Sequence, residues 1–133
     1  MTRVNVVPPK ELCNQHLLAE WREMPRLVKN LNASLNRKSK PFSKDEISPH
    51  YILGAGHVKF FFDKFKYLHK RHEVITTELL SRGYNLSNTN SDVFKSVDSK
   101  WYNDYIPTND ALKLNRERIE LRMPKSPKWI INI

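Results

Sequence analysis

A carboxylate stands between two arginines near the start of the chain, in the stretch that contains Arg22, Glu23 and Arg26. A carboxylate can act as a general base or stabilise a developing positive charge, and guanidinium groups bind phosphates. Winding at about 100° per residue places His16 and Glu23 together on one flank of the helix's apolar stripe, with Arg22 and Arg26 roughly opposite that stripe. The same run is also typical of a solvated helix face with pairs three and four residues apart. Other parts of the sequence are needed to distinguish a functional site from a solvated helix face.

The helix that must position these residues is predicted over Pro9 to Arg37. Its apolar residues recur every three or four positions and form a stripe that faces a core. They are Leu17, Trp21, Met24, Val28, Leu31 and Leu35. Pro9 suits a first helical turn, whereas Pro25 falls inside the helix and predicts a kink close to Glu23.

A second helix is predicted from His57 or Asp63 to Arg82, with Gly83 as a left-handed cap. Five apolar residues are expected to face inward: Phe61, Phe65, Leu68, Ile75 and Leu79. Five basic residues are expected to face outward as a basic surface: Lys64, Lys66, Lys70, Arg71 and His72.

A third helix is predicted from Ala111 to Met123, with capping residues from Thr108 to Asp110 before it and Pro124 after it. Few segments have the alternating pattern of strands. The sequence therefore predicts an all-α fold, a single compact domain over residues 1–133, with three main helices and long irregular connections. The connection Tyr84 to Pro107 contains the aromatic residues Trp101, Tyr102 and Tyr105 and is expected to pack on the body.

Charge identifies the class of partner. Twenty-three Lys and Arg residues against fourteen Asp and Glu residues give a net charge of +9, and nucleic acid is the polyanion that such a balance favours. A membrane surface is the competing partner, but the apolar stripe of the first helix is needed for the core. One cysteine, no signal-peptide pattern and no apolar run of about 18 residues predict a soluble, intracellular (cytoplasmic) protein, which we expect to be a monomer.

Met1 to Val7 forms a short, partly apolar leader that is expected to dock on the body or lie across a groove. Thr2 has a small side chain, so the initiator methionine is expected to be removed. Removal would expose the α-amine of Thr2.

Several stretches of the chain resemble one known family in register. They are Met-Thr-Arg-Val-Asn at the start, Asn14 to Arg26, Ile47 to Lys64, Lys70 to Asn85 and the Asp-Tyr-Ile-Pro of Asp104 to Pro107. In these stretches the chain is similar to the phage endonuclease V family, which are pyrimidine dimer DNA glycosylases with abasic-site lyase activity.

The resemblance implies that the α-amine of Thr2 attacks the anomeric carbon of a damaged nucleotide and forms an imine with the opened sugar. An α-amine titrates near 7.7 to 8.0, against about 10.4 for lysine, so part of it is a neutral nucleophile at neutral pH. Glu23 would stabilise the developing positive charge and help remove the proton whose loss drives β-elimination. Imine chemistry needs no metal and no cofactor.

The resemblance also implies a set of DNA-binding residues. They are Arg3, His16, Arg22, Arg26, His72, Arg118 and Arg122. His72 stands where the family's phage member has glutamine, at a position near the extruded nucleotide. The C-terminal tail also departs from the family, because it retains only Trp129 of a more aromatic segment.

The sequence thus predicts a bifunctional DNA glycosylase and abasic-site lyase that acts on duplex DNA containing cyclobutane pyrimidine dimers or abasic sites. Two alternatives stay open: a glycosylase for a different damaged base, and a non-catalytic basic DNA-binding protein. A metal-dependent nuclease is disfavoured, because the pair His69 and His72 has no third ligand and no carboxylate cluster is found.

Overall fold

The computed structural model describes residues 4–129. The α-helices in this part of the chain are α1 (Asn14–Glu23), α2 (Arg26–Leu35), α3 (His57–Phe60), α4 (Phe65–Ser81) and α5 (Asn109–Leu121). Short 3-10 turns lie at Pro9–Glu11, Lys44–Glu46, Asp92–Ser96 and Ser99–Trp101. No strand occurs within residues 4–129, so the all-α prediction is confirmed.

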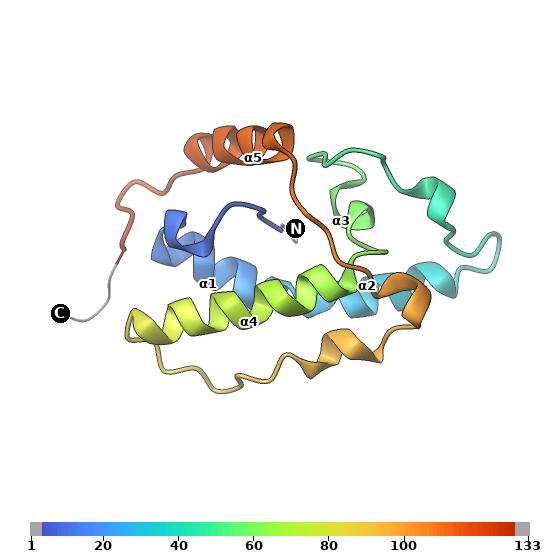
Figure 1. The fold of residues 1–133 in the computed structure, drawn as a ribbon, viewed down its shortest axis with the longest axis horizontal. Coiled ribbons are helices and arrows are strands. Elements are labelled where there is room, and N and C mark those ends of the chain that lie inside the picture. The colour runs from blue at the N-terminus through green and yellow to red at the C-terminus, as the bar shows by residue number, and fades with distance from the viewer. Residues whose placement is uncertain (1–3, 130–133) are drawn as a thin grey trace.

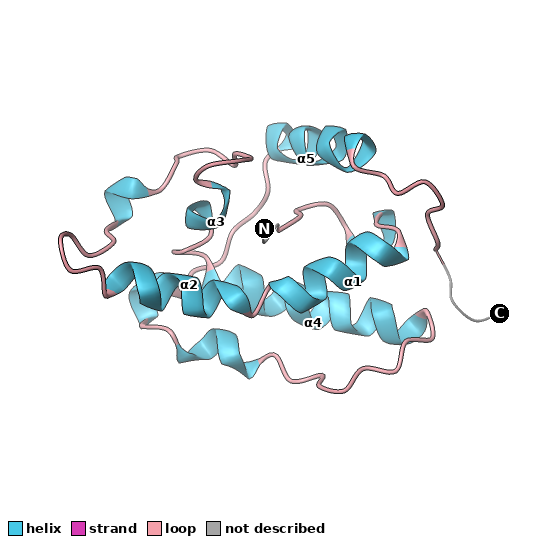
Figure 2. Ribbon diagram, turned by 180° about the vertical axis from the view of Figure 1, so that it is seen from behind, coloured by secondary structure: helices cyan, strands magenta, loops and turns pink. Residues whose placement is uncertain are grey.

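The helices surround the N-terminal segment. α1 and α2 follow one another along one side of the molecule, and α4 packs against α1 (Figure 1). α5 lies on the other side, and the beginning of the described chain runs between α5 and the α1–α4 pair, as both views show (Figures 1 and 2).

The first predicted helix is interrupted at both ends of α1. The structure confirms the break at Pro25, which separates α1 from α2. The predicted start at Pro9 is wrong, because Leu12 and Cys13 are extended after the 3-10 turn and α1 begins at Asn14. The guanidinium of Arg82 donates to the Leu12 carbonyl at 2.7 Å and the Pro9 carbonyl at 3.3 Å, so a tertiary contact takes the acceptors that a continuous helix would use.

The core contains the predicted apolar positions. From the first stripe, Leu17, Met24, Val28 and Leu31 are buried, and Trp21 and Leu35 pack against the core while partly exposed. All five inward residues predicted for the second helix are fully buried. The core cluster therefore joins α1, α2 and α4.

The second predicted helix is divided into α3 and α4, because the chain turns between Phe60 and Phe65. α4 ends as predicted at Gly83, whose φ of 98° is left-handed. The amide of Gly83 donates to the Leu80 carbonyl and that of Tyr84 to the Leu79 carbonyl, both at 3.1 Å. This pair of bonds is the Schellman arrangement that glycine favours.

The outward orientation predicted for Arg71 and His72 is wrong. Arg71 is 7% exposed and His72 is 3% exposed. Arg71 is neutralised by a buried ion pair with Glu20, and the His72 ring stacks on Trp21 at 5.9 Å between centroids. The charge of Arg71 and the ring of His72 therefore both have partners inside the protein.

α5 begins at Asn109 and ends at Leu121, two residues earlier than predicted at each end. The Thr108 hydroxyl accepts from the Ala111 amide at 3.1 Å, as its capping position predicts. Leu114 and Leu121 of this helix are exposed.

In the connection before α5, Phe94 and Trp101 are buried, so the predicted packing of this segment is confirmed.

None of the helices within residues 4–129 is long and apolar enough to cross a membrane.

Candidate active site

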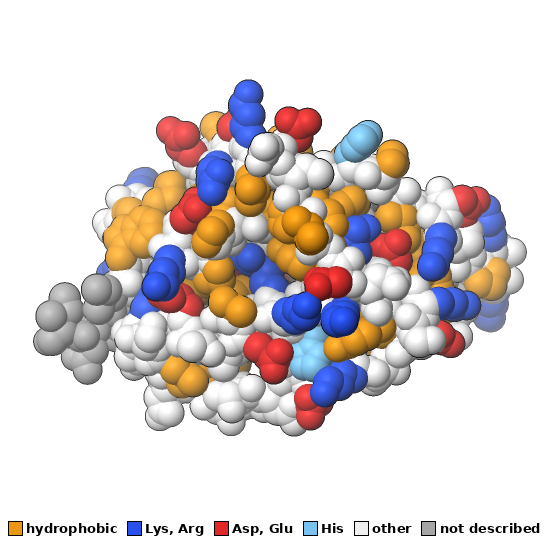
Figure 3. Space-filling model, in the orientation of Figure 1, with side chains coloured by type: hydrophobic (Ala, Val, Ile, Leu, Met, Phe, Trp, Pro, Cys, Tyr) orange, Lys and Arg blue, Asp and Glu red, His pale blue; other side chains and the backbone are white. Residues whose placement is uncertain are grey.

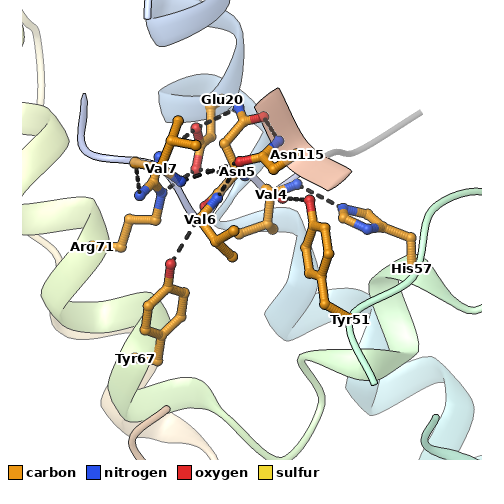
Figure 4. Close-up of polar contacts among 10 residues, drawn as sticks. All are labelled: Val4, Asn5, Val6, Val7, Glu20, Tyr51, His57, Tyr67, Arg71 and Asn115. Atoms are coloured by element: carbon orange, nitrogen blue, oxygen red, sulfur yellow. Dashed lines mark hydrogen bonds and ion pairs between the residues drawn. The ribbon is translucent and has the colours of Figure 1, made fainter. Parts of the chain in front are cut away.

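The described part of the leader, residues 4–7, is held inside the protein by side chains from several elements (Figure 4). Val4 and Val7 are completely buried. The Val4 amide donates to Nε2 of His57 at 2.9 Å, and the Tyr51 hydroxyl donates to the Val4 carbonyl at 3.2 Å. The predicted docking of the leader on the body is thus confirmed for these residues.

Asn115 of α5 holds the next turn of the leader. Its Oδ1 accepts from the amides of Val6 at 2.7 Å and Val7 at 3.1 Å. Its Nδ2 donates to Oδ1 of Asn5 at 2.8 Å. Asn115 itself is completely buried.

Glu20 of α1 and Arg71 of α4 hold the leader from the other side. Asn5 donates to the Glu20 carboxylate through its backbone amide at 3.2 Å and through its side-chain Nδ2 at 2.8 Å. Arg71 donates to the same carboxylate through Nε at 2.6 Å and Nη2 at 3.2 Å, and to the Val7 carbonyl through Nη1 at 2.8 Å. Bidentate pairing of this kind satisfies a buried charge.

Titration behaviour follows from this burial. Burial disfavours the charged form of Arg71, but the charge and hydrogen bonds of Glu20 outweigh it and raise the pKa of Arg71 above its usual value. Burial raises the pKa of Tyr67 to about 12, and its hydroxyl lies 3.4 Å from the Asn5 carbonyl, to which it donates. Both groups therefore keep their protons over the physiological pH range.

We call the side chains that bond to residues 4–7 the leader clamp. They are Glu20, Tyr51, His57, Tyr67, Arg71 and Asn115.

A cleft of about 370 Å³ lies between α1, α5 and the leader. We call it the α1–α5 cleft. It is lined by Asn5, His16, Ala19, Glu20, Glu23, Arg118, Ile119 and Arg122. Residues more than 90 positions apart in the sequence thus meet beside the N-terminal segment.

The cleft brings four of the predicted site residues together: His16, Glu23, Arg118 and Arg122. Nε2 of His16 lies 2.9 Å from the Arg122 carbonyl. Since a carbonyl can only accept, Nε2 carries the hydrogen in this contact. Nε of Arg118 is buried and has no hydrogen-bond partner among residues 4–129, which leaves a cationic donor in the wall of the cleft.

Arg26 points away from the core, as predicted, and lies beside Glu23. Its Nη1 is 3.2 Å from Oε2 of Glu23. The pair is three residues apart across the break at Pro25. Arg22 is exposed and faces a different hollow.

That second hollow, of about 390 Å³, holds Arg22 and His72. Its lining consists of Trp21, Arg22, Pro25, His72, Asn88, Asn90 and Val93. Nδ1 of His72 lies 2.6 Å from the Ser91 hydroxyl, whereas its buried Nε2 has no partner among the described residues. Burial lowers the pKa of His72, so this ring is neutral at neutral pH.

A third hollow lies on the opposite side of the leader and is apolar. It has a volume of about 480 Å³ and includes Val6, Val7, Val74 and Leu112 in its lining. Figure 3 shows apolar side chains gathered on this face between α5 and α4. The ion pairs Lys70–Asp104 and Arg116–Glu11 join residues at its border.

Two predicted site residues, Thr2 and Arg3, lie outside the described residues. Sequence reasoning missed Asn5, Glu20, Tyr67 and Asn115, and it placed Arg71 on the surface. The signal that could have found them is position, because Glu20 stands three residues after Leu17 and four before Met24, on the inward stripe.

No group of three or more His, Cys, Asp or Glu side chains within residues 4–129 has the arrangement of a metal site.

One comparison bears on this arrangement. A family model described as pyrimidine dimer DNA glycosylase matches residues 1–92, which is more than half of the 133-residue chain. The match includes the leader, α1 with Glu23, and all of α4 with Arg71 and His72.

Proposed function

The chain belongs to the pyrimidine dimer DNA glycosylase family, and from that premise we propose that it removes the damaged base and then cleaves the strand through an imine to the α-amine of Thr2. The enzyme is a DNA repair glycosylase whose partner is DNA containing pyrimidine dimers. The imine, the lyase step and the residues assigned to them are the proposal.

The observation that carries the proposal is the meeting of the leader with Glu23 in the α1–α5 cleft. Asn5 forms part of that cleft together with Glu23, and Val4 is fixed by His57 and Tyr51. Two residues of chain span at most about 7 Å, so the α-amine of Thr2 would act within that distance of Val4. A clamp of this kind supplies the orientation that a nucleophile needs.

Each step then has a group to perform it. The neutral α-amine would attack C1′ and form a C–N bond while the glycosidic bond breaks and the base leaves with one of the amine protons. The C1′–O4′ bond would then break as the second amine proton passes to O4′, which leaves the imine to the opened sugar. Glu23 would stabilise the cationic intermediate and take the C2′ proton, after which the 3′ phosphate leaves. Its place beside the tethered leader supports both roles.

The basic side chains around the cleft would hold the DNA backbone. Arg118 and Arg122 lie in the cleft wall, Arg26 stands beside Glu23, and Arg3 is next to the nucleophile in sequence. With a net charge of +9, such contacts would give phosphate binding that weakens strongly with salt.

Arg22 and His72 would contact an extruded nucleotide in the second hollow. The hollow is lined by Trp21 and His72, and the buried Nε2 of His72 has no partner among the described residues. Aromatic rings and one polar atom suit a nucleobase that has left the stack. Extrusion costs less at a dimer, because the lesion already weakens stacking.

Borohydride trapping tests the nucleophile. The purified protein is incubated with a duplex that carries one thymine dimer, borohydride reduces the imine, and the adduct is mapped by mass spectrometry. We expect a covalent adduct on Thr2 with Met1 absent, and no adduct when the α-amine has been acetylated beforehand. An adduct on a lysine would overturn the assignment of Thr2.

The same experiment separates the alternative functions. An adduct with an abasic duplex but not with the dimer duplex would favour a glycosylase for a different damaged base. Tight binding to both duplexes without any adduct would favour a non-catalytic DNA-binding protein.

A further inference from the structure

α5 has two buried residues, Ala111 and Asn115, and of these Asn115 is polar. Asparagine is a poor helix former in an interior position, and its burial needs hydrogen bonds to offset desolvation. All three bonds that satisfy it go to the leader: to the amides of Val6 and Val7 and to the side chain of Asn5.

The same face of α5 forms the wall of the α1–α5 cleft. Arg118 and Arg122 follow Asn115 by three and seven residues, a spacing that keeps the three side chains on one side of a helix. Arg118 and Arg122 line the cleft. Asn115 therefore fixes the position of the leader relative to the helix that carries these two arginines.

Asn5 completes the connection to α1. It bonds to Asn115 on one side and to the Glu20 carboxylate on the other, and Glu20 lies one helical turn before Glu23. Figure 4 shows Asn5 between these two partners. A continuous set of short bonds therefore runs from the helix of Glu23, through the leader, to the helix of Arg118.

We propose that Asn115 is a positioning residue for the imine step: it fixes the leader in register against α5, so that the α-amine reaches the sugar whose phosphates α5 holds. Because Asn115 is completely buried, it would act through the leader and not by touching the DNA. This inference rests on the proposed function of Thr2.

Loss of Asn115 leaves two buried amides without their acceptor. The leader must then shift or admit water to solvate them. A displacement of about 1 Å of a reacting group can slow a reaction by about 10²-fold, while phosphate contacts from exposed arginines are unchanged. Chemistry and DNA binding should therefore separate.

The test compares Asn115→Ala with two controls. Asn109→Ala makes the same substitution at an exposed position of α5. Phe42→Leu removes packing against Phe62 and Trp101, away from the leader, and serves as a control for stability. Each protein, in excess, is trapped with borohydride on a duplex that contains one abasic site, and its affinity is measured on a duplex with a tetrahydrofuran abasic analogue, well below its melting temperature.

We expect Asn115→Ala to slow single-turnover trapping at least about tenfold, with affinity within about twofold of the wild type. Both controls should trap at close to the wild-type rate. Equal rates for Asn115→Ala and Phe42→Leu at matched loss of stability, or a parallel fall in affinity and trapping for Asn115→Ala, would overturn the role of Asn115.

If Asn115→Ala does not fold, Asn5→Ala decides the question, because it removes the bridge but keeps both backbone bonds to Asn115. A slower trapping rate with unchanged affinity supports the positioning role, and a wild-type rate overturns it. Wild-type protein that gives no adduct on Thr2 overturns the proposed function and this inference with it. A normal wild-type adduct with unaffected variants overturns only the inference.

Discussion

Glu20 and Glu23 lie one turn apart on α1 and both border the same cleft, yet their environments are opposite. The Glu20 side chain is 1% exposed and is bonded by Arg71 and Asn5, whereas that of Glu23 is 28% exposed and pairs with the exposed Arg26. The oxygens of the Glu20 carboxylate accept hydrogen bonds that hold the fold together. The Glu23 carboxylate is partly exposed and can be reached by a substrate. Under the proposed function, the leader clamp would supply rigidity and the cleft would supply the reacting groups.

The difference between the two regions is also one of charge balance. In the leader clamp, the charges of Glu20 and Arg71 cancel inside the protein. In the cleft, Arg118 and Arg122 add positive charge that the single carboxylate of Glu23 does not balance. A phosphate backbone would restore this balance, so substrate and charge distribution fit one another.

Replacing Glu23 by Gln should give the largest effect. General acid–base groups contribute about 10² to 10⁴-fold to rates, so strand cleavage of dimer-containing duplex should fall by at least about two orders of magnitude. Binding to the same duplex should persist, which gel-shift titration checks. Full turnover by this variant would remove Glu23 from its assigned role and erase the contrast with Glu20.

Replacing Glu20 by Ala should act on stability instead. Arg71 would remain buried without its partner, which typically costs about 3 to 5 kcal/mol. Urea denaturation of the variant should show this loss in the free energy of unfolding. The double variant with Arg71→Met should recover part of it, since no unpaired charge remains, and a double variant no more stable than the single one would contradict the pairing.

Arginines from the two regions should differ in their effect on salt dependence. Replacing Arg122 by Gln removes one proposed phosphate contact, so the slope of log affinity against log salt should decrease by about 0.9. Stability should change little, because Arg122 is exposed. An unchanged slope would mean that Arg122 does not touch phosphate. Arg71, being buried and paired, is expected to leave the slope as it is.

The smallest effect concerns His72. Its pKa is lowered in the folded protein by burial, so the unfolded chain binds more protons as the pH falls below about 6.5, the usual value. The contribution of His72 to stability is therefore present at neutral pH and lost toward acid pH. The difference in unfolding free energy between pH 7 and pH 5 should shrink in His72→Gln, and an equal difference in both proteins would contradict a buried neutral ring.

Much of the fold followed from residue type and spacing. The apolar stripe around Leu17 and Leu31, the break at Pro25 and the cap at Gly83 are local signals, and each is present in the structure. The cleft was foreseen in part, since His16 and Glu23 share a flank of one helix. Whether the residues assigned there bind DNA or perform the reaction stays a prediction.

Two residues of the leader clamp, Arg71 and Asn115, were missed for the same reason. Arg71 follows Leu68 by three residues and precedes Ile75 by four, so its position is on the inward face, but its charge argued for the surface. Asn115 likewise stands four residues after Ala111 and four before Ile119. Periodicity outweighed polarity at each of these positions, because partners from distant segments satisfy the polar groups. A polar residue in step with an apolar stripe is thus the sequence signal of a buried network.

The contacts of the leader also set an order of events during synthesis. Val6 leaves the ribosome more than 100 residues before Asn115, its partner at a separation of 109. At about 5 to 20 residues per second, the N-terminus spends roughly 5 to 20 s outside the ribosome before the helix that fixes it exists. An enzyme that removes Met1, as the small Thr2 predicts, would have that interval in which to act. Completion of α5 then closes the interval, because Asn115 fixes Val6 and Val7 in place.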